Sequence, residues 1–161
     1  MTAEDRFLTR HGLYFEEFHP GLCVTTAGRT VTEADVVNFA GLSGDWTQIH
    51  CDAEYVKTHP FGQRVAHGLL GMSIASALLV RTGLVEETVL AFRQIDEWKF
   101  SRPICLGDTI HVRATAKETK AMARLGGGSV TLLVEIINQD GLVVQHGLWT
   151  MLIMGRPTAA V

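Results

Sequence analysis

The segment Gly68–Thr82 constrains the fold more than any other part of the chain, because it reads as a helix that is apolar nearly all round. Its small residues are Gly71, Ser73, Ala75, Ser76 and Ala77. A helix of this composition is buried on most of its sides, and the small residues let other backbone approach it closely. Arg81 in the last turn and Gly83 just beyond it predict where the helix ends. The rest of the chain must therefore enclose this helix.

After the helix the hydrophobic pattern changes to that of β-strands. The expected strands are Val89–Phe100, Thr109–Lys117, Ser129–Asn138 and Leu142–Met154. Gly126-Gly127-Gly128 is expected to be a loop, and Asp140-Gly141 predicts a type I′ turn that joins the last two strands in a hairpin. A single nearly all-apolar helix is hidden only if the sheet curls around it, so the predicted fold class is α+β.

Two shorter helices are expected before the buried one. Thr32 followed by Asp35 has the pattern of a helix start, and Ser43-Gly44 is expected to end that helix. Asp52 is expected to cap a second helix, Ala53–Lys57. The residues between these two helices are expected to form a loop.

The chain has 161 residues, which suits one domain with a sizeable core. Residues 1–20 show no clear period and are interpreted as an N-terminal arm, and Leu22–Thr26 can form a short strand. There is no internal repeat and no stretch of linker composition. Residues 1–161 are therefore predicted to form a single domain.

Charge and cysteine content disfavour several classes of partner. The net charge of −3 and a pI near 6.1 give no basic surface for nucleic acid or an anionic membrane. The longest apolar stretch is shorter than the roughly 20 residues that span a bilayer. Cys23, Cys51 and Cys105 are far apart and form no CxxC motif, so neither a disulfide framework nor a cysteine zinc site is predicted. We expect a cytoplasmic protein with no nucleic-acid and no membrane partner.

Asp45 and His50 lie five positions apart in a segment that opens with Ser43-Gly44. A carboxylate and an imidazole at this spacing can act as a general acid and base that hold and polarise a water molecule. The alternative is structural: Asp45 would cap a turn and His50 would only begin the next helix. Spacing alone leaves both interpretations open.

His67 and Gly68 stand at the entry to the buried helix. The first turn of a helix exposes unpaired backbone N–H groups, and its dipole adds positive potential there. The N–H of Gly68 is therefore a candidate donor to an oxyanion, with His67 and Ser73 as candidate substrate-binding residues. Packing at Gly68, a local hydrogen bond from His67 and a bond from Ser73 to its own helix are the structural alternatives. The histidine spacing matches no zinc motif, so no metal site is predicted.

These residues resemble the motif of the MaoC-like dehydratase family, the (R)-specific enoyl-CoA hydratases or hydratase 2. Its first part is Asp45-Trp46-Thr47-Gln48-Ile49-His50, and its second runs from Phe61 through Val65-Ala66-His67-Gly68-Leu69-Leu70. The family has an acid, a short spacer and a histidine, followed by an apolar–Ala/Val–His–Gly entry into the central helix. The resemblance extends from about Thr30 to Met154.

The resemblance implies a hot-dog fold, in which an antiparallel sheet wraps around a long central helix, assembled as a homodimer or a higher assembly of dimers. It also implies a hydro-lyase of fatty acid metabolism. Such an enzyme hydrates a trans-2-enoyl-CoA or dehydrates a 3-hydroxyacyl-CoA, and coenzyme A enters only as part of the substrate. Asp45 and His50 would activate the water and carry a proton to the α-carbon, and the N–H of Gly68 would bind the thioester oxygen. Ser73 falls where the family often has a supporting serine.

Two other functions remain open. The first is a thioesterase of the same fold, which would direct a water molecule at the thioester carbon. The second is a non-catalytic hot-dog subunit that binds acyl groups or pairs with an active partner. The presence of both Asp45 and His50 speaks against the second.

The chain departs from the family motif at Thr47-Gln48, where the family usually has Asn-Pro. Thr47 can replace one of the lost hydrogen bonds, so the departure bears on substrate preference more than on the reaction. Candidate residues for the wall of an acyl tunnel are Trp46, Leu70 and Trp98, each equally suited to the core.

Overall fold

The computed structural model describes residues 12–157. Its helices are η1 Phe15–Glu17, α2 Glu33–Ser43, α3 Gln48–Cys51, η2 Tyr55–Thr58, α4 Gly68–Val80 and η3 Ala123–Leu125. Its strands are β1 Cys23–Thr25, β2 Arg29–Thr30, β3 Val89–Phe100, β4 Thr109–Met122, β5 Gly127–Ile137 and β6 Val143–Met154. The long strands follow the long helix, as the hydrophobic pattern predicts.

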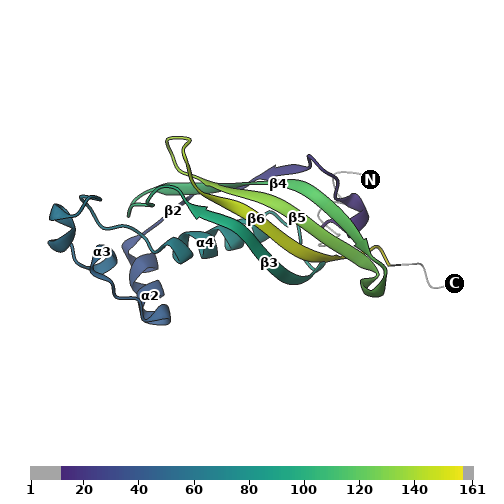
Figure 1. The fold of residues 1–161 in the computed structure, drawn as a ribbon, viewed down its shortest axis with the longest axis horizontal. Coiled ribbons are helices and arrows are strands. Elements are labelled where there is room, and N and C mark those ends of the chain that lie inside the picture. The colour runs from purple at the N-terminus through teal and green to yellow at the C-terminus, as the bar shows by residue number, and fades with distance from the viewer. Residues whose placement is uncertain (1–11, 158–161) are drawn as a thin grey trace, which may run out of the picture.

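The strands form an antiparallel sheet in the order β1-β4-β5-β6-β3, and the short strand β2 pairs with β4. The sheet curves along α4, which packs against β4 and β5 (Figure 1). An antiparallel sheet wrapped around one long helix is the hot-dog arrangement. The predicted α+β class and the hot-dog fold are therefore confirmed.

The hydrophobic core lies between α4 and the sheet. The residues of α4 buried in it include Leu70, Ile74, Leu78 and Leu79. The alternating residues of β4 that face the core are the predicted ones: Ile110, Val112, Ala114 and Ala116. Each large apolar side chain removed from water in this way contributes about 1.5–3 kcal/mol. One face of α4 remains exposed and carries Leu69, Ser73, Ala77 and Val80, so even the exposed face of this helix is largely apolar.

The predicted start of α2 and the cap at Asp52 are both present. The Thr32 hydroxyl accepts a hydrogen bond from the N–H of Asp35, and the Asp35 carboxylate accepts one from the N–H of Thr32. The helix ends at Ser43, where Gly44 adopts the left-handed conformation with φ of 76°. The Asp52 carboxylate accepts two backbone N–H bonds from the turn that begins η2.

The hairpin between β5 and β6 differs from the predicted type I′ turn. That turn requires positive φ at both central residues. Gly141 has φ of 74°, but Asp140 does not lie in the positive-φ region. The carbonyl of Asn138 instead accepts the N–H of Gly141 at 3.1 Å, and the N–H of Asn138 donates to the carbonyl of Leu142 at 3.0 Å. A turn of the type I class followed by a left-handed glycine therefore closes the hairpin.

Two strands extend beyond their predicted ends. β4 continues to Met122, and β5 begins at Gly127, so Gly127 and Gly128 are strand residues and not a loop. A Cβ on Gly127 would lie 2.2 Å from the carbonyl oxygen of Ile153. Glycine is required there by the close approach of neighbouring backbone. The triple glycine predicted a loop because its packing role is invisible in sequence.

Residues 12–20 pack on the fold and do not extend as an arm. Phe18 is buried in the core, and Phe15 packs against it. The N–H of Leu13 donates to the carbonyl of Leu84 at 2.9 Å. The earlier part of the predicted arm, residues 1–11, lies outside the described residues.

The helices α2 and α3 lie together at one end of the molecule, apart from the sheet (Figure 1). The chain returns from this end into α4, and His67 just before α4 contacts Asp45 just after α2. The two halves of the sequence motif are therefore adjacent in space. No helix within residues 12–157 is long and apolar enough to cross a membrane.

Candidate active site

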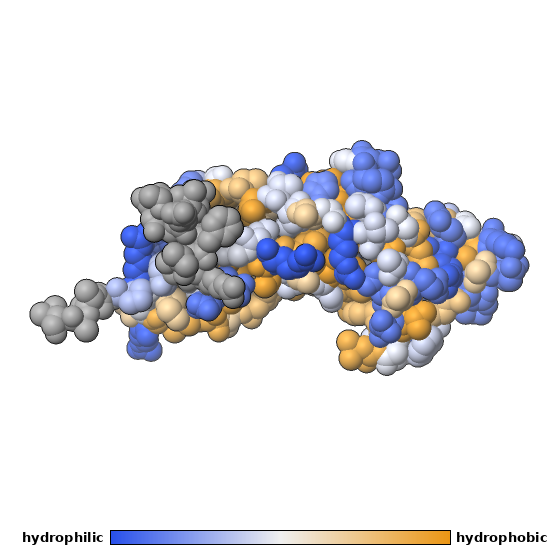
Figure 2. Space-filling model, turned by 180° about the vertical axis from the view of Figure 1, so that it is seen from behind, coloured by the Kyte–Doolittle hydropathy of each residue, from blue (hydrophilic) through white to orange (hydrophobic). Residues whose placement is uncertain are grey.

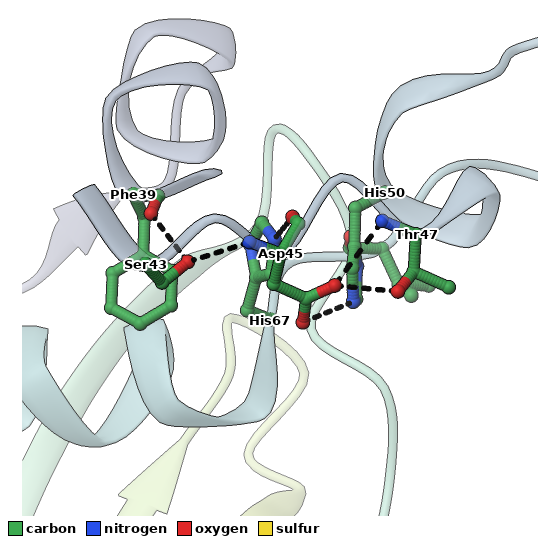
Figure 3. Close-up of polar contacts among 7 residues, drawn as sticks. Phe39, Ser43, Asp45, Thr47, His50 and His67 are labelled. Carbon is green, nitrogen blue, oxygen red and sulfur yellow. Dashed lines mark hydrogen bonds and ion pairs between the residues drawn. The ribbon is translucent and has the colours of Figure 1, made fainter. Parts of the chain in front are cut away.

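Asp45 lies in the turn between α2 and α3, and its backbone is held on both sides (Figure 3). The Ser43 hydroxyl donates to the carbonyl of Phe39 at 2.7 Å and accepts the N–H of Asp45 at 3.2 Å. The carbonyl oxygen of Asp45 accepts a hydrogen bond from Nε2 of His67 at 2.9 Å. The left-handed Gly44 provides the reversal that brings these groups together. The backbone position from which the Asp45 side chain extends is therefore fixed by hydrogen bonds.

The carboxylate of Asp45 is about half exposed. Its Oδ1 accepts hydrogen bonds from both the hydroxyl and the backbone N–H of Thr47. These bonds, the hydroxyl's first and the N–H's second, lower the pKa of the Asp45 carboxyl below its usual value. Thr47 thus supplies two hydrogen bonds to this carboxylate. Oδ2 is left facing His50.

Gln48 is the first residue of α3. Proline suits that position because the first N–H groups of a helix need no partner within it. The family's proline and the glutamine of this chain can therefore begin the same short helix. This explains why the spacing between Asp45 and His50 survives the change.

His50 lies in α3 and not in a loop, and it is 7% exposed. Its Nδ1 is 2.7 Å from the carbonyl oxygen of Val65. Because a carbonyl can only accept, Nδ1 carries the hydrogen, and Nε2 of the neutral ring is an acceptor. Nε2 lies 4.0 Å from Oδ2 of Asp45 (Figure 3). The structure thus places two proton acceptors side by side.

His67 lies behind this pair and does not line the pocket described below. It is 2% exposed, and its ring stacks on that of His50 with centroids 3.8 Å apart. Its Nε2 holds the carbonyl of Asp45, and its Nδ1 is buried without a hydrogen-bond partner among the described residues. His67 therefore supports Asp45 and His50 from behind the pocket. The prediction that it binds substrate does not fit this position.

Gly68 is the first residue of α4, and no side chain caps this end of the helix. A Cβ at this position would lie 2.7 Å from the ring of Phe100. Glycine is therefore required for close packing here, as the structural alternative held. Packing and oxyanion binding are compatible, because the first-turn N–H groups of α4 still have no capping side chain.

A pocket of about 560 Å³ adjoins His50. Its wall includes His50 and Gly68, and most of the remaining wall is apolar. The main apolar contributors are Ile49, Phe61, Leu69, Phe100 and Ile104. Asp45 does not itself line the pocket but lies 4.0 Å from the His50 nitrogen. A largely apolar cavity with a few convergent polar groups is typical of a small-molecule site.

Ser73 and the three candidate tunnel residues lie elsewhere. The Ser73 hydroxyl donates to the carbonyl of Leu69 in its own helix at 2.8 Å, and Ser73 does not line the pocket. Leu70 is buried in the core, Trp98 packs against it, and Trp46 is 55% exposed. None of these residues contributes to the pocket wall.

Three side chains of the site carry atoms of the kind that bind metal ions: Asp45, His50 and His67. One such atom from each residue lies within 4.8 Å of the other two. The 4.0 Å between Oδ2 of Asp45 and Nε2 of His50 exceeds the roughly 3.3 Å expected for two ligands of one tetrahedral zinc. One nitrogen of each histidine already bonds a backbone carbonyl. The arrangement as it stands suits an acid–base pair better than a metal centre.

Sequence reasoning missed Gln145, which lines the pocket from β6. Its side chain is 2% exposed, and its Nε2 donates to the carbonyl of Gly68 at 3.1 Å. The sequence signal that could have identified Gln145 is the alternation of buried and less buried residues along β6. Gln145 is a polar residue in phase with the buried residues Trp149, Met151 and Ile153.

The fold and the site define a hot-dog protein with a carboxylate and an imidazole, those of Asp45 and His50, beside the N-terminal end of its central helix. The family model described as MaoC like domain matches residues 18–137. The chain belongs to this family.

The chain is similar to several known proteins. It is 35% identical over 115 residues to an (R)-specific enoyl-CoA hydratase of Rhodospirillum rubrum, covering 71% of this chain and 74% of that protein. It is 44% identical over 104 residues to Protein MaoC of Klebsiella aerogenes, covering 65% of this chain but only 30% of that protein. A solved structure titled as a monoamine oxidase regulatory protein from Archaeoglobus fulgius has a TM-score of 0.84 and 35% identity, covering 91% of this chain and 97% of that one.

Proposed function

We propose that this protein is a hydro-lyase that adds water to a trans-2-enoyl-CoA thioester or removes water from a 3-hydroxyacyl-CoA. The observation that carries the proposal is the 4.0 Å separation of Asp45 Oδ2 and His50 Nε2 beside a pocket that also contains Gly68. The names of relatives from Rhodospirillum rubrum and Methylorubrum extorquens, an (R)-specific enoyl-CoA hydratase and a 3-hydroxybutyryl-CoA dehydratase, support this choice of reaction.

The separation of the two acceptors suits one water molecule. An oxygen that makes two hydrogen bonds of about 2.8 Å at roughly a right angle bridges groups about 4.0 Å apart. The Asp45 carboxylate and the neutral His50 ring both accept, so the water donates one hydrogen to each. Its lone pairs are then free to face the substrate.

In the hydration direction, a lone pair of this water forms a bond to C3 of the enoyl thioester. The C2–C3 π electrons move towards C2 and the thioester oxygen. One proton of the water passes to the Asp45–His50 pair, and the other remains in the new hydroxyl group. The pair then returns a proton to C2, which yields the 3-hydroxyacyl thioester. Because water and proton come from the same pair, both add to one face of the double bond.

Negative charge grows on the thioester oxygen as the C3–O bond forms. The N–H of Gly68 can donate to that oxygen, and the positive end of the α4 dipole reinforces the interaction. Removing one donor of this kind from an enzyme costs about 10²–10³ in rate. Gly68 therefore supplies the stabilisation that the acid–base pair cannot.

The reaction changes no oxidation state overall and needs no cofactor besides the coenzyme A of the substrate. The apolar wall of the pocket suits an acyl chain, and Arg102 at the wall offers a positive charge to an anionic ligand. The three cysteines are free thiols, which fits a reducing, cytoplasmic setting.

We also propose that the protein assembles as a homodimer through the edge of β3. This strand ends the sheet, and its exposed apolar residues are Val89, Leu90, Phe92, Ile95 and Phe100. Figure 2 shows apolar residues gathered along the lower margin of the molecule, the side on which β3 lies in Figure 1. An exposed apolar edge strand readily pairs with another chain, so a second copy is the partner we propose.

The proposed reaction is tested by following the loss of enoyl absorbance of crotonyl-CoA. We expect turnover by the wild type, and Asp45→Asn and His50→Ala should each lower kcat by about 10²–10⁴. Asp140→Asn, in the exposed hairpin, serves as the matched control. Activity of both variants within tenfold of wild type would remove the pair from catalysis. Release of free thiol without 3-hydroxyacyl-CoA would instead indicate the thioesterase, and binding without turnover the non-catalytic subunit.

A further inference from the structure

Gln145 is a buried polar side chain that the proposed mechanism does not use. It is 2% exposed and lies in phase with the apolar residues of β6. It nevertheless forms part of the wall of the pocket that contains His50 and Gly68. A buried amide in a largely apolar wall costs free energy unless its polar atoms are paired, so its presence calls for an explanation.

The orientation of the Gln145 amide follows from its one hydrogen bond. The Gly68 carbonyl can only accept, so the group 3.1 Å from it is the donor Nε2. Gly71, one turn further along α4, leaves the space that this amide occupies, since a Cβ there would lie 2.6 Å from Nε2. The chain therefore makes room for a side-chain amide against the first turn of α4.

The other end of the amide is unpaired. Oε1 of Gln145 is buried and has no hydrogen-bond partner among the described residues. An acceptor in this position stabilises a ligand that brings a donor and disfavours one that does not. The unpaired atom belongs to a residue that touches both the pocket and the carbonyl of Gly68, the residue proposed to bind the thioester oxygen.

We infer that Gln145 is a specificity-determining residue whose Oε1 accepts a hydrogen bond from an N–H or O–H group of the thioester substrate. The inference rests on the proposed function, because the thioester oxygen is placed at the N–H of Gly68. The hydrogen bond from Nε2 to the carbonyl of the same residue keeps Oε1 within a few ångströms of that point. Two substrate groups lie at a suitable distance from the thioester carbon. One is the first amide N–H of the coenzyme A arm, and the other is a hydroxyl on C4 of the acyl chain.

Phe100 lies next to Gln145 in the wall of this pocket. It is paired with Gln145 across β3 and β6, and its ring covers Gly68. The side chain is 54% exposed.

The test compares two pairs of substrates that differ by one donor. The first pair is crotonyl-CoA and its analogue with an ester oxygen in place of the first amide N–H of the arm. The second pair is 4-hydroxycrotonyl-CoA and crotonyl-CoA. We expect the wild type to prefer the donor-bearing member of one pair by about tenfold in kcat/KM. The pair that shows the preference identifies the source of the donor.

Gln145→Met, which keeps the length of the side chain but has no acceptor amide, should reduce that preference to within about twofold. Gln63→Met is the matched control, since Gln63 is exposed and does not line this pocket, and it should keep the wild-type ratio. Each ratio compares substrates on one protein, so partial loss of folded enzyme cancels. Gln145→Leu replaces the methionine variant if thermal melting shows that the latter is unfolded.

A wild type that prefers neither donor-bearing substrate would overturn the role of Gln145 without any variant. An unchanged preference in Gln145→Met would overturn it as well. If the wild type does not hydrate crotonyl-CoA, the proposed function fails separately. In that case the affinities of the same substrate pairs, measured by calorimetry, decide the role of Gln145 by the same ratios.

Discussion

The imidazole rings of His67 and His50 stack with their centroids 3.8 Å apart and their planes inclined by 30°. On its other side the His67 ring meets Phe39 at 5.0 Å, and its Nε2 donates to the carbonyl of Asp45. One buried ring therefore touches both Asp45 and His50. It helps to set the separation between them without contacting the pocket.

Replacement of His67 by phenylalanine tests this supporting role, because the ring is kept and only the donor to Asp45 is lost. We expect His67→Phe to lower kcat by about tenfold with little change in KM. The free energy of unfolding should fall by about 1 kcal/mol. Steady-state kinetics with crotonyl-CoA and denaturant unfolding measure the two effects. An unchanged kcat in a destabilised variant would reduce His67 to a packing residue.

Thr47→Val tests the hydrogen bonds to Asp45. The pKa of this carboxyl is lowered mainly by the Thr47 hydroxyl, so its working, ionised form persists to lower pH in the wild type. Loss of the hydroxyl raises the pKa of Asp45 towards its usual value. The acid limb of the profile of kcat/KM against pH should therefore move to higher pH, by part of the full shift because the backbone N–H remains. A limb that stays in place would mean that another group controls it.

Gly68→Ala tests the contact between α4 and Phe100. The added Cβ would lie 2.7 Å from the Phe100 ring, whose exposed side chain must then move. We expect kcat/KM to fall by about tenfold as the first turn of α4 shifts. Phe100→Ala in the same chain should restore most of the loss. Equal losses in the single and double variants would show that the contact is not the cause.

Ile95→Lys tests the proposed dimer edge. Ile95 is 40% exposed on β3, and a lysine there opposes pairing of this edge with a second copy. Sedimentation should show a dimeric wild type and a monomeric variant. Leu142→Lys, an equally exposed apolar position in the β5–β6 hairpin, is the control and should remain dimeric. A monomeric wild type would contradict the proposal.

Removal of metal ions distinguishes two interpretations of this site, an acid–base pair and a metal centre. Asp45, His50 and His67 could supply donor atoms, yet the proposed reaction requires no ion. Dialysis against EDTA should leave kcat for crotonyl-CoA within twofold of its starting value. A loss that added Zn²⁺ or Mg²⁺ reverses would assign the three residues to a metal centre.

Local pattern predicted a sheet curled around a buried helix, and the resemblance to a family motif added the hot-dog fold and the catalytic interpretation of Asp45 and His50. The apolar helix from Gly68 must be enclosed, and the alternation over Thr109–Lys117 indicates a strand with one buried face. Asp45 and His50 are only five positions apart, so one turn and one short helix decide their separation. Patterns of this kind depend on residues close together in the chain, so they are visible in the sequence.

Tertiary structure decided how the pair is held and what surrounds it. Asp45 is fixed by His67, 22 positions away, and Gln145 reaches Gly68 across 77 positions. The strand residues Gly127 and Gly128 were misread as a loop for the same reason, since only neighbouring strands and Phe15 explain them. These contacts depend on the register and curvature of the sheet, which no short stretch of sequence encodes. Residue type and local period therefore determined the helices, the strands and the proximity of Asp45 and His50, and long-range packing determined the pocket beside them.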